Sequence, residues 1–295
     1  MNEFLTPSVI AEVAAKLVGS DANLSALVSK DLAADFREGS GNVISIRVPG
    51  SIAAQTRGIY DKSTPLVSSD LSEQTVDVTL SDHVYDSIIL SSGDLDMEIA
   101  DFATQVLRPQ ASAITKFVER ATATAMSATP ETTGISWDAL DPARTFTAIR
   151  KQLRDNGVDT DTPILAAVGS SVWAALLDGP VGTFDAPGVT RGVAVVESTR
   201  LAPDEIVAFV RDAFSVIVRA PAVPDGAPYG ASVAAGEFAV RHLRAFDASI
   251  AADRSIVSAY VAVSALPLAI DNEDGTVSLV ANAGAVRVLT STIPA

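Results

Sequence analysis

Serine and histidine are the residues of this sequence that could support nucleophilic catalysis. Ser170 and Ser171 follow Gly169 where a predicted helix begins directly after a predicted strand, which is the position of the nucleophile in many serine hydrolases. His242 could act as the base. The second glycine of the G-x-S-x-G motif is missing, and a serine at a helix start is usually an N-cap. We therefore expect Ser170 to cap the helix, and a serine hydrolase is the less favoured alternative.

Patterns for binding metals and cofactors are weak. A zinc site needs three or four His, Cys or carboxylate ligands, whereas His83 and His242 are the only histidines and lie far apart in the sequence. The acidic run 271–274 resembles a calcium loop, but its Gly275 comes one place too early. No glycine-rich phosphate loop precedes a predicted helix. The sequence therefore predicts no catalytic residues, no metal and no cofactor, so we expect a protein that is not an enzyme.

Composition limits the possible partners. The chain has 295 residues, of which 48% are hydrophobic and only 5% aromatic, so it can form a large core of small side chains. It has no cysteine, and its net charge is −15, with 21 basic residues scattered without a run. Tight nucleic-acid binding is therefore not expected, although an acidic container wall that repels packed DNA is compatible with this charge.

The sequence predicts neither a signal peptide nor a transmembrane segment. Residues 1–4 are acidic and lack the basic flank of a signal peptide, which argues against a secreted β-rich surface protein. The longest nearly apolar stretch, residues 256–270, is too short to span a bilayer.

The first third of the chain predicts a helix followed by a β-rich region. Thr6 and Pro7 begin a helix whose apolar stripe contains Val9, Val13 and Leu17, and a second amphipathic segment covers residues 24–36. Period-two alternation predicts strands at residues 43–48 and 75–80. The polar, glycine-containing connection 49–74 is long for a compact domain, and we interpret it as a projecting arm.

Residues 94–128 give the strongest helical signal. Apolar residues recur every three or four positions up to Val106, and the pattern resumes with Ile114, Phe117 and Val118. Pro109 lies inside this segment and cannot donate a backbone hydrogen bond, so a kink is expected there. A helix of this length would be much longer than the average globular helix.

The remaining chain predicts a mixture of helices and strands. Helices are expected from Pro142 to a stop at Gly157 and over residues 170–177, with strands at 163–168 and 193–196. Two hairpins are expected, the first pairing 205–210 with 213–219 and the second pairing 237–247 with 255–266. One or two weak strands follow Asp271.

This order of elements resembles the Hong Kong 97-like shell fold of tailed-bacteriophage major capsid proteins. The string GNVISIRVP at 41–49 resembles the strand that enters the extended loop (E-loop) of that family, and DFATQVLRP at 101–109, continued by FVER at 117–120, resembles its spine helix. EST at 197–199, followed by LAP at 201–203, resembles the strand and turn that close the axial domain. The resemblance covers roughly residues 1–270.

The resemblance implies an α+β mixed fold divided into five parts. These are an N-terminal arm at 1–42, the E-loop with its flanking strands at 43–92, the spine helix of the peripheral domain at 93–133, the axial domain at 134–236, and the returning β-hairpin with a C-terminal tail at 237–295. The arm begins at once, which implies a separate scaffolding protein or none. The segment between Pro180 and Glu237 leaves no room for a large inserted domain.

The resemblance also implies a function and partners. Copies of the chain would assemble into hexamers and pentamers of an icosahedral head that encloses double-stranded DNA without sequence-specific binding. The scaffold and a portal would be further partners, and the protein would be found in the virion after assembly in the bacterial cytoplasm. An encapsulin-type compartment that holds a cargo enzyme shares this fold and is the alternative.

The arm itself is the candidate contact between subunits. Exposed alone, its apolar side chains would be a liability, whereas docked on a neighbour they would be buried while its charged groups pair across the contact. The residues concerned are Ile52, Arg57, Ile59, Tyr60, Asp61, Lys62, Leu66 and Val67. In some relatives an E-loop lysine forms an isopeptide bond, but nothing in this sequence marks Lys62 for it, and we expect a solvated or ion-paired lysine.

Overall fold

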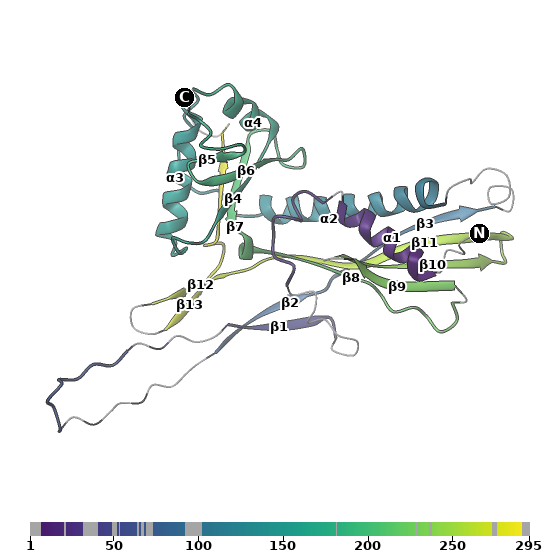
Figure 1. Cartoon of the computed structure of the whole chain (residues 1–295), viewed down its shortest axis with the longest axis horizontal. Helices are drawn as coiled ribbons and strands as arrows, with labels where there is room; N and C mark the ends of the chain where they lie inside the picture. The colour runs from purple at the N-terminus through teal and green to yellow at the C-terminus, as the bar shows by residue number, and fades with distance from the viewer. Residues whose placement is uncertain are drawn as a thin grey trace.

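The computed structural model describes residues 7–20, 22–31, 41–48, 52, 54–63, 65, 68, 73–91, 102–180, 182–227, 229–235, 238–272 and 276–290. Two five-stranded sheets lie at opposite ends of an elongated molecule, which we call the long sheet and the short sheet (Figure 1). Two small two-stranded sheets accompany them. The combination of helices and separate sheets confirms the α+β mixed fold expected from the sequence.

The long sheet is antiparallel and carries helices on one face. Its strands run in the order β3 (Asp82–Leu90), β11 (Ala252–Ala265), β10 (Phe238–Asp247) and β9 (Tyr229–Ala235), and β8 (Phe214–Arg219) pairs with the end of β11. Helices α1 (Pro7–Ser20) and α2 (Arg108–Ser127) pack side by side against it. The β10–β11 pairing confirms the second predicted hairpin. Strand β3 was not predicted.

The short sheet contains one parallel pair. Its order is β14 (Ala285–Leu289), β7 (Glu205–Val210), β4 (Ile164–Val168), β6 (Val193–Glu197) and β5 (Val189–Thr190), with β4 and β6 parallel. Helices α3 (Pro142–Asp155) and α4 (Ser170–Leu177) belong to the same end of the molecule. All residues of β7 are buried, so its apolar run is that of a strand covered on both faces.

The first predicted hairpin is wrong. Strands β7 and β8 do not pair: β7 pairs with β4 and β14, whereas β8 pairs with β11 in the long sheet. The 3₁₀ turn η4 (Arg211–Ala213) between them is the point where the chain leaves one sheet for the other. Both strands are almost fully buried, so their sequences give no alternation that would identify the partner. Strands β8 and β9 lie within residues 134–236, the range expected for the axial domain, but they belong to the long sheet. Strand β14 lies after that range and belongs to the short sheet.

The arm begins as a regular hairpin. Strands β1 (Val43–Val48) and β2 (Gln74–Thr79) are antiparallel, with Val43 opposite Thr79 and Val48 opposite Gln74. This agrees with the two predicted strands. Val78 is buried against Ile217 of β8. The neighbouring hairpin of β12 (Leu268–Asp271) and β13 (Val277–Val280) touches the arm, because the Gln74 amide donates to the carbonyl of Val277 at 2.6 Å.

Helix α1 confirms the expected N-terminal helix but presents a different face to the core. The buried residues are Ile10, Ala11, Ala14, Ala15 and Val18. Val9 is 42% exposed, so the stripe predicted through Val9, Val13 and Leu17 is rotated by one position. The small alanines, which a hydrophobicity pattern undervalues, allow the helix to approach the sheet closely.

Helix α2 is preceded by a five-residue π-helical turn, η3 (Ala103–Leu107). Pro109 lies in the first turn of α2, at the change from one hydrogen-bond pattern to the other. The buried stripe contains Ile114 and Val118 as predicted, whereas Phe117 is 39% exposed and does not belong to it. The predicted helical residues 94–101 lie outside the described part of the chain.

A buried carboxylate on α2 holds the segment that follows α1. Glu119 is 3% exposed and accepts the backbone N–H groups of Asn23, Leu24 and Ser25 at 2.9–3.0 Å, together with the Ser25 hydroxyl. Beyond it, Ser29 forms a parallel bridge with Ser215 at the start of β8. Within the amphipathic segment expected at 24–36, the backbone of Leu24 and Ser25 thus bonds to α2, and that of Ser29 bonds to β8. Residues 32–36 lie outside the described chain.

A second buried carboxylate joins the two ends of the molecule. Glu205, the first residue of β7, is 2% exposed and accepts a hydrogen bond from Arg287 Nε of β14 at 2.6 Å. It also accepts the Ser127 hydroxyl at the end of α2 and the N–H of Ala202. One side chain thus connects the long helix with a middle strand and an edge strand of the short sheet.

We predict that Glu119→Ala destabilises the subunit by about 3 kcal/mol or more, because it leaves several buried donors without an acceptor. Glu12→Ala removes only the exposed pair with Lys16 and should cost less than about 1 kcal/mol. Urea denaturation of both variants measures the difference. Equal losses for the two variants would contradict the role of Glu119.

Candidate assembly surface

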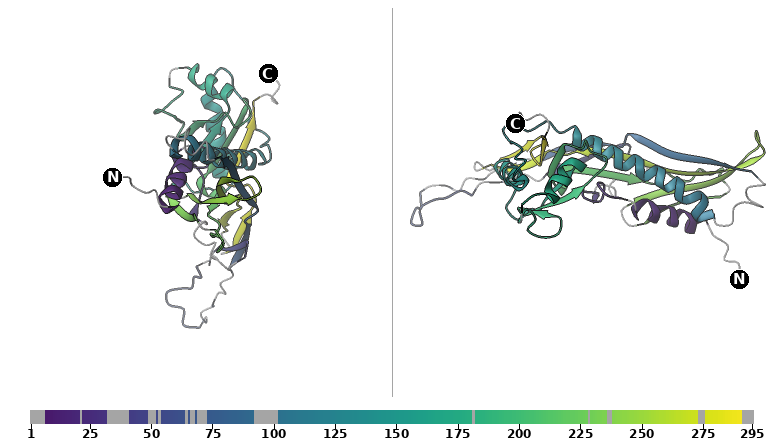
Figure 2. Two further views of the ribbon diagram at one scale, coloured as in Figure 1. Left: turned by 90° about the vertical axis from the view of Figure 1, so that its right-hand side faces the viewer. Right: turned by 90° about the horizontal axis from the view of Figure 1, so that it is seen from above.

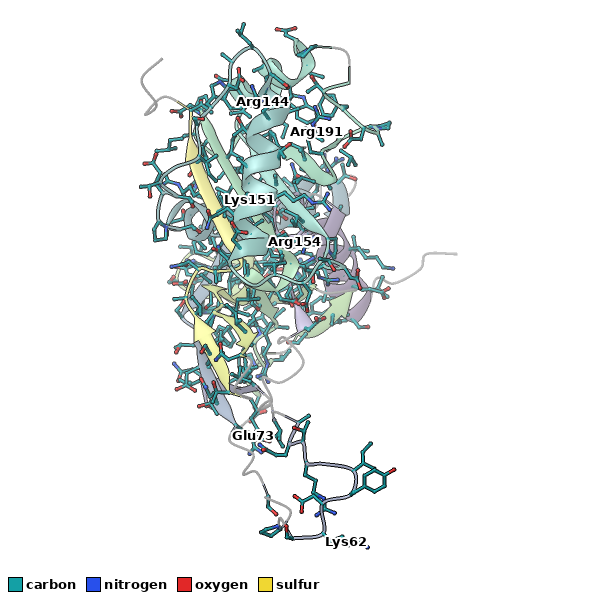
Figure 3. All side chains as sticks on the ribbon, turned by 90° about the vertical axis from the view of Figure 1, so that its left-hand side faces the viewer. Lys62, Glu73, Arg144, Lys151, Arg154 and Arg191 are labelled. Atoms are coloured by element: carbon teal, nitrogen blue, oxygen red, sulfur yellow. The ribbon has the colours of Figure 1, made fainter. Side chains whose placement is uncertain are left out.

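The projecting arm carries the most exposed large apolar side chains of the described chain. Ile59 is 95% exposed and Tyr60 is 92% exposed, and Ile52 nearer the base is 52% exposed. The arm extends away from both sheets, so these side chains have no surface of their own subunit to cover them (Figures 1 and 3). Surface of this kind is normally buried by a partner.

A local turn gives the tip a defined shape. The N–H of Asp61 donates to the carbonyl of Gly58 at 3.0 Å, and the Asp61 carboxylate accepts both the N–H and the hydroxyl of Ser63 at 2.8 Å. Arg57 is exposed, and Lys62 projects from the outermost part of the arm (Figure 3). Leu66 and Val67 lie outside the described residues. The arm thus presents apolar and charged groups together, as the sequence predicted.

Other large apolar side chains are exposed elsewhere and were missed from the sequence. On the long sheet, Tyr85 is 65% exposed and Ile89 is 52% exposed, both on β3. On the short-sheet end, Leu140 is 89% exposed. The alternation through residues 83, 85, 87 and 89 was the available signal, because these residues of β3 are exposed and the residues between them are half-buried.

The structure does not assemble a serine-hydrolase site. Ser170 begins α4 at the short-sheet end, and His242 lies on β10 of the long sheet, at the other end of the molecule. Ser170 is also not the N-cap: Gly169 holds that position, and no side chain caps the helix. Instead, the carbonyl of Pro203 accepts the N–H of Ser171 at 3.0 Å.

Gly169 is required by this close approach. A Cβ at that position would lie 1.9 Å from the carbonyl oxygen of Ala202, so any other residue would displace the 201–203 turn. The glycine that suggested a nucleophile motif therefore allows the turn after β6 to lie against the start of α4. This is a packing role.

His242 is buried in a polar network between α2 and the long sheet. Its Nε2 lies 3.1 Å from the hydroxyl of Ser255, which donates to Gln110 Oε1 at 2.9 Å. Gln110 in turn donates to the carbonyl of Ser255 at 2.9 Å. Phe102 packs edge-on against the imidazole ring. His242 Nδ1 has no hydrogen-bond partner within the described residues.

Burial, helped by the nearby Arg244 guanidinium, lowers the pKa of His242 from 6.5 to about 4. The imidazole is therefore neutral at physiological pH. Protonation would place a charge, and a donor at Nδ1, where the network offers no acceptor. His242 is a structural residue that ties α2 to the sheet.

His83 lies within β3, a strand that was not predicted from the sequence. Its ring packs against those of Tyr85 and Tyr260, and it lines a hollow of about 620 Å³ at the base of the arm. Desolvation, and then the Arg241 charge, lower the pKa of His83. Within the described part of the chain, His, Asp and Glu residues do not gather in groups of three that could bind a metal.

Comparison with known proteins identifies the architecture. No protein-family model matches the sequence, and no curated protein matches it. A solved structure from Mycobacterium phage Che8 matches with a TM-score of 0.60 and 17% identity over 92% of each chain. The capsid asymmetric unit of cyanophage A-1(L) matches with a TM-score of 0.59 and 11% identity, covering 91% of this chain and 93% of the other. The chain has the capsid fold.

A related architecture also matches. The virus-like particle from Pyrococcus furiosus has a TM-score of 0.51 and 10% identity, covering 95% of this chain and 97% of the other.

In the described part of this capsid-fold chain, no helix is both long and apolar enough to cross a bilayer.

The pKa of His242 leads to a prediction about stability and pH. The unfolded histidine titrates near 6.5 and the folded one near 4, so between these values the unfolded state binds more protons and stability falls as pH decreases. Below about pH 4 the loss reaches roughly 3 kcal/mol and then levels off. His242→Gln should reduce the slope of stability against pH between 6.5 and 4.

Urea denaturation at pH 7, 5.5 and 4.5 measures this slope. His83→Gln changes an exposed histidine whose pKa is lowered without a large shift, so this comparison variant should reduce the slope less than His242→Gln does. An unchanged slope for His242→Gln would show that His242 does not titrate as described.

Proposed function

We propose that this chain is the major capsid protein of a tailed bacteriophage and that it self-assembles, as hexamers and pentamers, into the shell that encloses double-stranded DNA. The observation that carries the proposal is the arm of a capsid-fold subunit, which ends in Ile59 and Tyr60 at more than 90% exposure. A structural role without catalysis is consistent with the separation of Ser170 from His242.

The energetics of the arm support assembly. A fully buried Ile or Leu side chain contributes about 1.5–3 kcal/mol relative to an exposed one, whereas an exposed ion pair contributes at most about 1 kcal/mol. Docking Ile52, Ile59 and Tyr60 on a neighbouring copy would therefore supply several kilocalories per mole for each contact. Arg57, Asp61 and Lys62, with Leu66 and Val67, would complete this contact.

The proposed partners follow from a shell of this kind. Copies of the chain would be the main partner, with a separate scaffolding protein and a portal during assembly in the bacterial cytoplasm. The finished location would be the virion. The enclosed DNA would be held without base-specific recognition, because the chain has a net charge of −15.

An encapsulin-type compartment is the second candidate, favoured by the similarity to the Pyrococcus furiosus particle. Such a shell would hold a cargo enzyme in place of DNA. A neighbouring portal gene would favour the capsid, and particles that contain protein cargo and no DNA would favour the compartment.

We predict that the purified protein forms rings or shells, either alone or with its scaffold. Sedimentation velocity and negative-stain electron microscopy of concentrated protein would detect them. A strictly monomeric protein under all these conditions would contradict the proposed function.

Replacing residues 52–70 by a short Gly-Ser linker should leave a folded subunit that no longer forms stable shells, since these residues support no core of their own. Ile59→Ser with Tyr60→Ser should weaken assembly in the same direction, whereas Ile59→Val with Tyr60→Phe should retain it. Circular dichroism tests folding and sedimentation tests assembly. Normal assembly of the linker variant would exclude the arm as an intersubunit contact.

Pro109 is proposed to set the direction of the spine helix, since it lies where the π-helical turn meets α2. Pro109→Ala should leave the subunit folded and change the curvature of the shell or its maturation. Particle diameters measured by electron microscopy test this. Shells of unchanged size, stability and maturation would refute the kink.

A further inference from the structure

The outward face of α2 carries a row of cations. Arg108, Lys116 and Arg120 are exposed, and their spacing of eight and four residues places them on one side of the helix. They extend along about 18 Å of the helix axis. The view from above in Figure 2 shows α2 lying over the long sheet, on the surface of the molecule.

These cations lack neutralising partners. The only acid of α2 is Glu119, which is buried and points toward the 23–25 segment. Several other cations of the described chain are paired, such as Lys16 with Glu12 and Lys151 with Asp155. Within the described residues, no ion pair involves Arg108, Lys116 or Arg120.

A fourth cation extends the row. A hollow of about 380 Å³ near the end of α2 is lined by Arg120, Thr124, Ser127 and Ala128, together with Arg200 from the turn after β6. Two arginines from separate parts of the chain therefore line the same hollow. Guanidinium is the side-chain group best suited to phosphate oxygens. We call Arg108, Lys116, Arg120 and Arg200 the basic face.

We propose that the basic face contacts the phosphate backbone of the enclosed double-stranded DNA, so that this side of the long sheet forms the inner wall of the shell. This inference rests on the proposed function. Contacts from three or four cations are weak for one subunit of net charge −15, but a shell repeats them in every copy. The wall is thus attractive along α2, although the whole chain is acidic.

The test measures binding of the full-length, unassembled subunit to a fluorescent 30-base-pair DNA by anisotropy at several salt concentrations. With three phosphate contacts, the logarithm of the binding constant should fall with that of salt with a slope of about −2.7, which is about 40-fold between 50 and 200 mM. The triple variant R108Q/K116Q/R120Q should bind at least tenfold more weakly at 50 mM salt, with a slope near zero.

The matched control is R144Q/R150Q/K151Q on α3, which removes the same charge from an exposed helix whose cations already have protein partners (Figure 3). It should bind DNA within about twofold of the unaltered protein. Equal losses in the two variants would mean that only net charge matters, and would overturn the proposal. Undetectable binding by the unaltered subunit at 50 mM salt would also overturn it.

Polyglutamate of equal charge serves as a competitor. Weak competition by polyglutamate supports DNA as the partner of the basic face. If polyglutamate displaces the DNA at equal charge concentration, the partner would instead be an acidic protein segment. Electron microscopy of the same variants separates this proposal from the proposed function. If shells form but the triple variant binds DNA as well as the unaltered protein, only the basic face is refuted. If the unaltered protein forms no shells, the proposed function is refuted.

Discussion

The carboxylate of Glu205 is the point at which the two ends of the molecule are joined. It accepts hydrogen bonds from Ser127 at the end of α2, from Ala202 in the turn after β6, and from Arg287 on β14. A buried carboxylate is stable only when such donors surround it, so the groups constrain one another. The orientation of the short sheet relative to the long helix is therefore set by a few hydrogen bonds in addition to the 3₁₀ turn between β7 and β8.

Helix α2 has different roles on its two sides. Toward the sheet it presents Gln110 and Glu119, which satisfy backbone groups of distant segments, and apolar residues such as Ile114. Toward solvent it presents cations. The inward polar groups make the helix position specific, because a shift by one residue would leave several buried groups without partners. A cationic row held by such a helix has a fixed place on the subunit surface.

Local patterns predicted the elements well where one face of a segment is exposed. The alternation of 43–48 and the capping signals before Pro142 predicted β1 and α3, and the resemblance predicted their order. Pairing between distant buried strands could not be predicted, since β7 and β8 are apolar on both faces. The turn at 23–25 was also missed, because its hydrogen bonds go to Glu119, more than ninety residues away. Of the candidate contact residues, Ile59 and Tyr60 are exposed as expected, whereas the basic face was hidden in a count of scattered cations.

Strand β14 adds an element of timing to this architecture. It contributes an edge of the short sheet and supplies Arg287 to Glu205, yet it follows every other strand in the chain. During synthesis, the short sheet thus lacks one edge strand until residues 285–289 have left the ribosome. Until then, the backbone groups of β7 that pair with β14 have no partner strand. The long sheet with its two helices can form earlier, because all of its strands precede residue 266. Completion of the short sheet is consequently coupled to late translation.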